Sequence, residues 1–409
     1  MQNTITEAGS TTTMDLAAIQ SALRENNLDG WLFYDHHNRD HLAYRILGIP
    51  GGHITRRWYY FIPAQGEPKK LVHRIESHKL DLLPGPKTEY SSWQELESKL
   101  ESMLTGATKI AMQYSPRNAI MYISLVDAGT VELLRSFKKD IVSSADLVSH
   151  FEAVLTEAQI ATHYEAQRRL DDILAEGWRE IGTRVRANGS TDEFTIVEFL
   201  QRAIAQAGMI TEHGPNVSVG PNSADSHYEP TRASSKPIRR GDFVLIDIWS
   251  KLANNPRAIW YDITWTGVVD REPTDREHLI FNTVRDARDD AIAVIQQAFA
   301  ANTPIAGWQV DDASRAIIRS AGFADFFTHR TGHNIATELH GNGAHLDNLE
   351  THDTRLILPN TCFSVEPGLY FSSADGHSEA FGVRNEVNMI TRPGRAEVTG
   401  RIQNELVRI

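Results

Sequence analysis

The spacing of apolar residues predicts alternating helices and strands along the first 150 residues or so. Leu16, Ile19 and Leu23 have the spacing of one helix face, and the apolar run GWLFYD at 30–35 predicts a short buried strand. The same reasoning predicts further strands at 56–63, 69–73 and 109–114 and another helix at 93–104. Strands that alternate with helices indicate a small layered α/β domain.

A new pattern begins at Thr156, which has capping-box spacing with Gln159. Apolar residues then recur at helical spacing as far as the breaker at 187–189. Ser190 and Glu193 have the spacing of a second capping box, which predicts another helix directly after the breaker. Strand-like segments follow this helix pair.

The same order of elements returns about 114 residues later. Leu279, Val284 and Ala291 lie on one stripe of a predicted long helix, a breaker follows at 302–304, and a second helix ends at Gly322. Strand-like segments that carry Asp, His or Glu follow each helix pair. We interpret the two stretches as degenerate copies of one helix–helix–sheet unit, whose sheets could meet around one pocket.

Length and composition are those of an ordinary globular protein with more than one domain. A chain of 409 residues exceeds the size at which one core usually keeps growing, and it is 41% hydrophobic and 23% charged. We expect a polar tail at 1–14, an α/β domain at 15–155 and an α+β domain at 156–409. No apolar run is long enough to cross a membrane, and the N-terminus lacks the features of a secretory signal.

Charge and cysteine usage narrow the possible functions. A formal net charge of −12 argues against a nucleic-acid partner, because an acidic surface repels phosphate backbones. Cys362 is the only cysteine, which excludes an intrachain disulfide framework and a cysteine-rich zinc site. We therefore expect a reducing, cytoplasmic environment and a metal, if there is one, held by oxygen and imidazole.

Isolated acids within apolar strands are the strongest chemical signal. Asp247 lies in FVLIDIWS and Asp262 in AIWYDITWTGVV, and a hairpin of these two strands would turn both carboxylates to one side. For either aspartate alone, exposure at a strand edge is an equally good interpretation. Two such acids among Ile and Val favour a shared cation, because a buried, unpaired carboxylate costs several kcal/mol.

The second copy also carries isolated acids, together with histidines, in apolar segments. FTHRTGHNIATELHG carries His329, His333 and His340, although any one of these rings alone would be read as exposed or structural. Glu366 lies in the apolar strand NTCFSVEPGLYF and Glu386 in FGVRNEVNMI. Solvated acids have no reason to occupy the middle of apolar strands, so these positions indicate a metal site.

The ordered set of acids and histidine resembles the pita-bread metallopeptidases, which include methionine aminopeptidases, Xaa-Pro aminopeptidases and prolidases. The resemblance covers about 156–409, and the residues that carry it are Asp247, Asp262, His333, Glu366 and Glu386. Gly332 precedes His333, Glu366 opens a Glu-Pro-Gly segment, and Glu386 closes Val-Arg-x-Glu, as in that family. His340 and the upstream His227 also match family positions.

Two further positions resemble the proline-specific branch of that family. His329 precedes His333 by four residues, and Arg384 precedes Glu386 by two. An N-terminal α/β domain of this size is similar to that of the Xaa-Pro enzymes and of the creatinase relatives. The resemblance implies a Xaa-Pro dipeptidase, with a Xaa-Pro aminopeptidase on longer peptides or a creatinase-type hydrolase as alternatives.

The resemblance also implies a cofactor and roles for these residues. Two divalent ions are expected, manganese before cobalt or zinc, with Asp262 and Glu386 bridging them and a shared hydroxide as nucleophile. Asp247 would complete one ion, and His333 with Glu366 the other. Glu366 would also shuttle protons. His340 and His227 are expected at the oxyanion and the leaving nitrogen, His329 at the substrate, and Arg384 at a substrate carboxylate, at Glu386 or in a plain salt bridge.

The expected partners are a small peptide with proline second and a second copy of the chain. Relatives with this N-terminal domain are commonly dimers, which makes His53 and the segment 56–63 candidates for contacts with the partner. Taken one by one, the aromatic residues of that segment fit a buried core better than a partner contact.

The sequence also departs from the family pattern. The first aspartate usually begins an Asp-x-Gly motif, and here Trp249 occupies the glycine position. Trp265 occupies a position where the family usually has an arginine. The two aspartates lie fifteen residues apart, which implies a longer hairpin loop. The lost arginine removes no expected ligand, but its absence and the longer loop leave the shape of the substrate pocket open.

Overall fold

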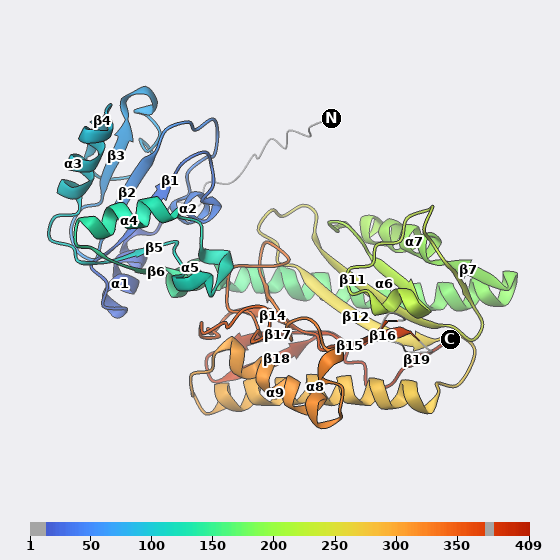
Figure 1. The fold of residues 1–409 in the computed structure, drawn as a ribbon. Coiled ribbons are helices and arrows are strands. Elements are labelled where there is room, and N and C mark those ends of the chain that lie inside the picture. The colour runs from blue at the N-terminus through green and yellow to red at the C-terminus, as the bar shows by residue number, and fades with distance from the viewer. Residues whose placement is uncertain (1–13, 373–379) are drawn as a thin grey trace. The chain divides into compact units, whose positions relative to one another are not determined.

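The computed structural model describes residues 14–372 and 380–409, and the expected polar tail at 1–14 falls almost wholly outside them. The chain divides into two compact units, Met1–Glu152 and Ala153–Ile409 (Figure 1). No helix within the described ranges combines the length and the apolarity needed to cross a membrane.

The first unit is built on a six-stranded mixed sheet with the order β4-β3-β2-β1-β5-β6. Alternate residues of β1 face opposite sides of it: Trp31 and Phe33 join one apolar cluster, Leu32 and Tyr34 the other. The strands are β1 (Gly30–Asp35), β2 (Trp58–Pro63), β3 (Lys69–His73), β4 (Lys87–Tyr90), β5 (Lys109–Met112) and β6 (Asp140–Ser143).

Helices cover both faces of this sheet, so the α/β prediction is confirmed. Ile19, Leu42 and Leu147 of α1, α2 and α5 join the cluster of Trp31, and helices α3 and α4 join the other. The helices are α1 (Leu16–Glu25), α2 (His41–Leu47), α3 (Trp93–Met103), α4 (Ala128–Ser136) and α5 (Ala145–Ala153).

The second unit contains the two predicted helix–helix–sheet halves. In the first half, a helix pair packs on strands β9, β11 and β12 through one apolar cluster. Its elements are α6 (Glu157–Asn188), β7 (Ser190–Asp192), α7 (Glu193–Gln206), β8 (Met209–Ile210), β9 (Asn216–Val219), β10 (Pro237–Arg239), β11 (Phe243–Leu252) and β12 (Tyr261–Val268). The strand order around β11 is β19-β12-β11-β8, with β9 also paired to β11.

The second half repeats this arrangement, with its helix pair packed on β14, β17 and β18. Its elements are α8 (Asp275–Ala300), α9 (Gly307–Ser320), β13 (Asn334–Ile335), β14 (Cys362–Val365), β15 (Gly368–Phe371), β16 (Phe381–Arg384), β17 (Val387–Arg392) and β18 (Arg395–Thr399), with β19 (Val407–Arg408) returning to the first half. In Figure 1 the two helix pairs lie on opposite sides of the strands, which places the two sheets face to face in the interior. This is the predicted α+β architecture of pseudo-symmetric halves.

Several local predictions need correction. The predicted capping box of Ser190 and Glu193 is wrong: Asp192 is the N-cap of α7, and its side chain accepts the Thr195 amide. Leu279 is 55% exposed, so the buried stripe of α8 begins at Ile280 instead. For the segment 56–63 the favoured core interpretation holds, since Trp58 to Phe61 are buried in the first unit.

The sequence contexts of Glu366 and Glu386 predicted positions in the middle of strands, and this prediction is wrong. Glu366 falls between β14 and β15, and Glu386 falls between β16 and β17. Strand β14 pairs with β17, whereas β15 pairs with β16 in a separate sheet. Both acids therefore stand where the chain passes from one sheet to the next, and backbone pairing is interrupted there.

Candidate metal centre

The β11–β12 hairpin sets two carboxylates on one face. In its antiparallel register Asp247 lies opposite Thr264, and Trp249 lies opposite Asp262. Residues two apart and residues directly opposite share a face, so all four side chains point the same way. Asp247 and Asp262 are buried, as the hairpin prediction requires.

The second half brings its ligand candidates to this face through backbone hydrogen bonds. The Glu386 amide donates to Thr264 O at 3.2 Å, which ties the break between β16 and β17 to β12. The Glu366 amide donates to Thr331 O at 2.7 Å. The His333 amide donates to Ser364 Oγ at 2.9 Å, so His333 and Glu366 are fixed to each other's segments.

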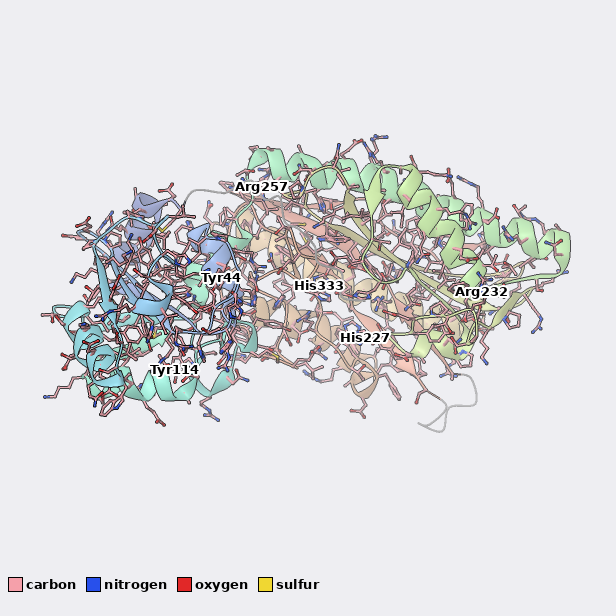
Figure 2. The ribbon with its side chains drawn as sticks, turned by 90° about the horizontal axis from the view of Figure 1, so that it is seen from above. Tyr44, Tyr114, His227, Arg232, Arg257 and His333 are labelled. Atoms are coloured by element: carbon pink, nitrogen blue, oxygen red, sulfur yellow. The ribbon has the colours of Figure 1, made fainter. Side chains whose placement is uncertain are left out.

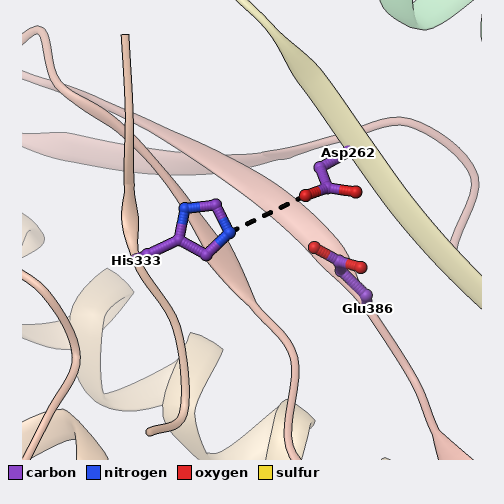
Figure 3. A group of neighbouring side chains, drawn as sticks. All are labelled: Asp262, His333 and Glu386. Atoms are coloured by element: carbon purple, nitrogen blue, oxygen red, sulfur yellow. Dashed lines mark ion pairs between the residues drawn. The ribbon is translucent and has the colours of Figure 1, made fainter. Parts of the chain in front are cut away.

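Asp262, His333 and Glu386 converge on one point (Figure 3). One ligand atom from each lies within 4.8 Å of the others, and all three residues are buried. His333 Nε2 is 3.7 Å from Asp262 Oδ2 and 3.3 Å from Glu366 Oε1. The structure thus brings four of the five predicted ligands together: Asp262, Glu366 and Glu386 surround the Nε2 side of the His333 ring.

Arg384 links the fifth candidate, Asp247, to this group. Its guanidinium forms an ion pair with Asp247, and its Nε donates to Thr264 Oγ1 at 3.0 Å. Its Nε also lies 3.9 Å from Glu366 Oε2. Of the alternatives stated for Arg384, these contacts match the plain salt bridge, here with Asp247, and an ion pair with Glu386 is not among those of the described residues.

Burial dominates the electrostatics of the carboxylates. It raises the pKa of Asp247 to about 7 and that of Asp262 to about 8. Burial also raises the pKa of Glu386 well above its ordinary value, and the charges of Asp262 and Glu366 add to the rise. Burial alone would raise the pKa of Glu366 too, but the charges of His333, Arg384 and His329 outweigh it and lower the pKa.

The donor set fits divalent cations. Asp247 Oδ1, Asp262 Oδ1 and Glu386 Oε1 are buried, and none has a hydrogen-bond donor within 14–372 or 380–409. His333 Nδ1 lies 3.2 Å from Asn334 O, so the proton belongs on Nδ1 and the Nε2 lone pair faces carboxylates. Lone pairs facing lone pairs repel, and a cation between them removes the repulsion. Burial also lowers the pKa of His333 to about 4, which keeps the ring neutral.

Two of the remaining predicted histidines lie near these ligands: His340 contacts His333, and His329 contacts Tyr370. The His340 ring stands edge-on to His333 with centroids 4.3 Å apart. Repulsion from His333 when that ring is protonated in acid, followed by burial, lowers the His340 pKa to about 3. His329 Nε2 lies 2.8 Å from the Tyr370 hydroxyl, and burial lowers the His329 pKa to about 4.

His227 is exposed and lies in the same unit as His333 (Figure 2). Its charge also lowers the pKa of His340, so the two rings are within electrostatic reach of each other. The loop that carries His227 is anchored by Glu193, a fully buried residue. Glu193 accepts four hydrogen bonds: from the amides of Val219 and Lys236, the Asn222 side chain and the Tyr228 hydroxyl.

Sequence reasoning missed three groups that contact predicted site residues, two of them at metal ligands. The Thr264 hydroxyl donates to Glu386 Oε2 at 2.7 Å, and Ser364 Oγ donates to Glu366 Oε1 at 2.9 Å. Tyr370 lies against His329, and burial raises its pKa to about 12. Their spacing held the signal, because Thr264 and Ser364 each stand two residues from a predicted ligand.

Comparison with known proteins places this centre in a family. The sequence matches Metallopeptidase family M24 over residues 162–393, more than half of the chain. It is 25% identical over 245 residues to the Xaa-Pro dipeptidase of Lactobacillus delbrueckii subsp. lactis, covering 59% of this chain and 58% of that protein. The chain spans about half the length of the curated relatives it matches.

Solved structures share the whole fold. The structure of dipeptidase PepE from Mycobacterium ulcerans matches with a TM-score of 0.67 at 20% identity, covering 96% of each chain. The Xaa-Pro dipeptidase from Bacillus anthracis matches with a TM-score of 0.62 at 19% identity, covering 96% of this chain and 99% of that one. These likenesses confirm the predicted pita-bread architecture. The chain belongs to metallopeptidase family M24.

Proposed function

We propose that the chain is a Xaa-Pro dipeptidase that works with two divalent ions, manganese first among them. The observation that carries the proposal is the buried convergence of Asp262, His333 and Glu386, with Glu366 and Asp247 beside them. Family membership supports a divalent metal. Relatives named Xaa-Pro dipeptidase support the substrate class.

The carboxylates and the imidazole would share the ions between them. Asp262 and Glu386 would contact both, Asp247 one, and His333 with Glu366 the other. When bound, such ions polarise a carbonyl and make water acidic enough to lose a proton near neutral pH. Four carboxylates supply enough negative charge for two such ions, and hard oxygen ligands suit manganese.

Residues of the chain would manage protons and charge around the scissile bond. Glu366, whose lowered pKa keeps it ionised, would take a proton from water and pass it to the leaving nitrogen. His340, beside His333, would stabilise the oxyanion, and His227 would contact the substrate near the leaving group. The positive charge of Arg384 opposes the effect of burial on the pKa of Asp247 and would favour the ionised carboxylate that binds a metal.

Preference for proline would come from the surroundings of His329. Its ring contacts those of Phe327 and Tyr370, each with centroids 5.3 Å apart, and it stays neutral near pH 7. An Xaa-Pro bond has no N–H, so a site that offers aromatic faces and demands no donor there suits the pyrrolidine ring.

The finer expectations on assembly and location belong to this proposal. A homodimer remains our expectation, and the exposed residues His53 and Arg56 remain candidate contacts of the first unit. The single cysteine, buried Cys362, supports a cytoplasmic location.

The test is hydrolysis of a peptide panel by purified protein loaded with Mn²⁺. We expect cleavage of Ala-Pro and Gly-Pro, with Ala-Ala at least about a hundredfold slower, since the aromatic wall and the tertiary amide act together. Faster cleavage of Ala-Pro-Ala than of Ala-Pro would replace the dipeptidase by an Xaa-Pro aminopeptidase. Equal cleavage of Ala-Ala and Ala-Pro would remove the preference for proline and leave the metal site untouched.

A further inference from the structure

Trp249 lies on the same face of β11 as the first predicted metal ligand. Side chains two apart on a strand share a face, which groups Trp249 with Asp247 before it and Lys251 after it. Asp247 pairs with Arg384 at one end of this row. Lys251 Nζ donates at 2.8 Å to Thr337 O, in the segment between His333 and His340, at the other end. Trp249 therefore stands between Arg384 and the segment that leads to His340.

The indole of Trp249 is held in place while part of it remains exposed. Its Nε1 donates to Glu212 O at 2.7 Å. Its ring packs on Gly214, where an added Cβ would lie only 2.3 Å from the indole Cη2. Gly214 is thus required for this packing, and the ring cannot swing toward the 212–214 segment to make room for a ligand.

Trp249 also borders the metal centre itself. It lies directly opposite Asp262 in the hairpin, and such pairs have Cβ atoms about 5 Å apart. Arg384, Tyr370 and His329 lie on the Asp247 side of this pair. His329 and Tyr370 therefore lie toward the Asp247 end of the row, whereas Trp249 stands across the hairpin from Asp262, one step closer to Lys251.

We infer that Trp249 limits the size of the substrate's first side chain. The inference rests on the proposed function: if the proline ring lies against His329 and Tyr370, the residue on the other side of the scissile bond extends toward Trp249. Glycine and alanine fit in front of a fixed indole, whereas phenylalanine and leucine meet it. Trp249 would be a specificity residue that takes no part in bond cleavage.

The test compares kcat/KM for Ala-Pro and Phe-Pro in the manganese-loaded parent and in Trp249→Ala. The parent is expected to prefer Ala-Pro at least tenfold, and Trp249→Ala to reduce that preference to below threefold, chiefly by faster turnover of Phe-Pro. Trp249→Phe should give an intermediate preference. Trp265→Phe is the matched control: contrary to the expectation from its sequence position, Trp265 points to the opposite face of the hairpin from Asp247 and packs on the helix-side core.

Metal content and melting temperature are measured for each variant, so that loss of folding is separated from a change of preference. If Trp249→Ala is unstable, Trp249→Phe and Trp249→Leu carry the comparison. An unchanged Ala-Pro to Phe-Pro ratio in folded, metal-loaded variants would overturn the inference and leave the proposed function standing. A parent that cleaves neither peptide would overturn the proposed function first and this inference with it.

Discussion

At the scale of single residues, the carboxylates of Asp262 and Glu386 are held in a costly state. Each is buried, and each has one oxygen without a donor in the described part of the chain. The Thr264 hydroxyl satisfies the other oxygen of Glu386. A protein gains nothing from such groups unless a cation binds them, which makes these two residues the most sensitive points of the proposal.

Replacing either acid by its amide should abolish hydrolysis while the fold survives. We expect Asp262→Asn and Glu386→Gln to reduce Ala-Pro cleavage to the rate of the enzyme-free control, because an amide is a far weaker ligand than a carboxylate. Asp171→Asn is the control, since Asp171 is a buried acid whose oxygens accept from Gln167 and Tyr261. Activity above about a tenth of the parent in either ligand variant would refute the assignment, whereas Asp171→Asn should stay within a few-fold.

The raised pKa of Asp262 predicts how metal-free protein responds to pH. Between about pH 4 and pH 8 the folded protein keeps a proton that the unfolded chain has released, so its free energy of unfolding falls as the pH rises. The slope approaches about 1.4 kcal/mol per pH unit for one group.

Asp262→Asn has no proton to hold at this position. In urea unfolding of metal-stripped proteins, the variant should therefore gain stability relative to the parent as the pH is raised from 4 to 8. Identical pH profiles for the two proteins would show that Asp262 titrates normally in the folded state.

The identity of these residues could be predicted from sequence because acids within apolar segments are rare. The side chains that pair with these acids could not be predicted from sequence. The Arg384–Asp247 pair depends on the direction in which β16 presents its side chains, which no spacing encodes. Glu193 has the spacing of a capping residue, yet it is buried and anchors a loop, because contacts with 219–236 are made through the fold.

At the scale of elements, the loop that carries His227 depends on its anchor. The Tyr228 hydroxyl donates to Glu193 at 2.7 Å, next to His227 in the chain. A hydrogen bond to a buried charge contributes about 1.5–3 kcal/mol. Its loss in Tyr228→Phe should free the neighbouring segment without touching the metal centre.

We expect Tyr228→Phe to lower kcat/KM for Ala-Pro by about tenfold, at unchanged metal affinity by calorimetry. Tyr164→Phe is the matched control, because Tyr164 donates to Glu397 at the same 2.7 Å away from this loop. Equal effects of the two substitutions on kcat/KM would mean that Tyr228 contributes stability alone.

Strand positions were largely predictable, and strand breaks were not. The apolar runs around Glu366 and Glu386 each look like one strand, because both sides of the break are buried and apolar. The break arises from pairing, since β14 and β15 have different partners. Pairing partners are distant in sequence, so only the folded chain shows that the acids occupy the breaks.

At the scale of the whole second unit, His163 joins the two halves. Its Nδ1 lies 2.7 Å from Trp260 O in the first half, and its Nε2 lies 2.9 Å from Thr399 Oγ1 in the second. Burial lowers the His163 pKa to about 4, so the ring is neutral in the folded protein near pH 7. The unfolded chain takes up a proton here below about pH 6.5, and acid therefore lowers stability.

His163→Gln should be less stable than the parent by about 1–3 kcal/mol at pH 7, because a buried bonded ring is lost. The difference in free energy of unfolding between parent and variant should narrow as the pH falls from 6.5 to 4, since the variant has no histidine at this position whose protonation favours the unfolded chain. Exposed His352 supplies the control, and His352→Gln should follow the parent throughout. A gap that stays constant across this range in guanidinium unfolding would contradict the role assigned to His163.

The repeated helix–helix–sheet pattern predicted the architecture of this unit, because each copy carries its own apolar stripes and helix breakers. The repeat could not predict the contacts between the two halves. There the Asp262 amide donates to Asn388 Oδ1 and the Glu386 amide donates to Thr264 O, contacts that bring ligands from both halves together.

The most direct test of the central claim is the number of divalent ions bound by the metal-stripped chain, measured by calorimetric titration with Mn²⁺ and checked by elemental analysis. We predict about two ions per chain in the parent, with binding lost in Asp262→Asn and retained in Asp171→Asn. Failure of the folded parent to bind Mn²⁺, Co²⁺ or Zn²⁺, or undiminished binding in Asp262→Asn, would contradict it.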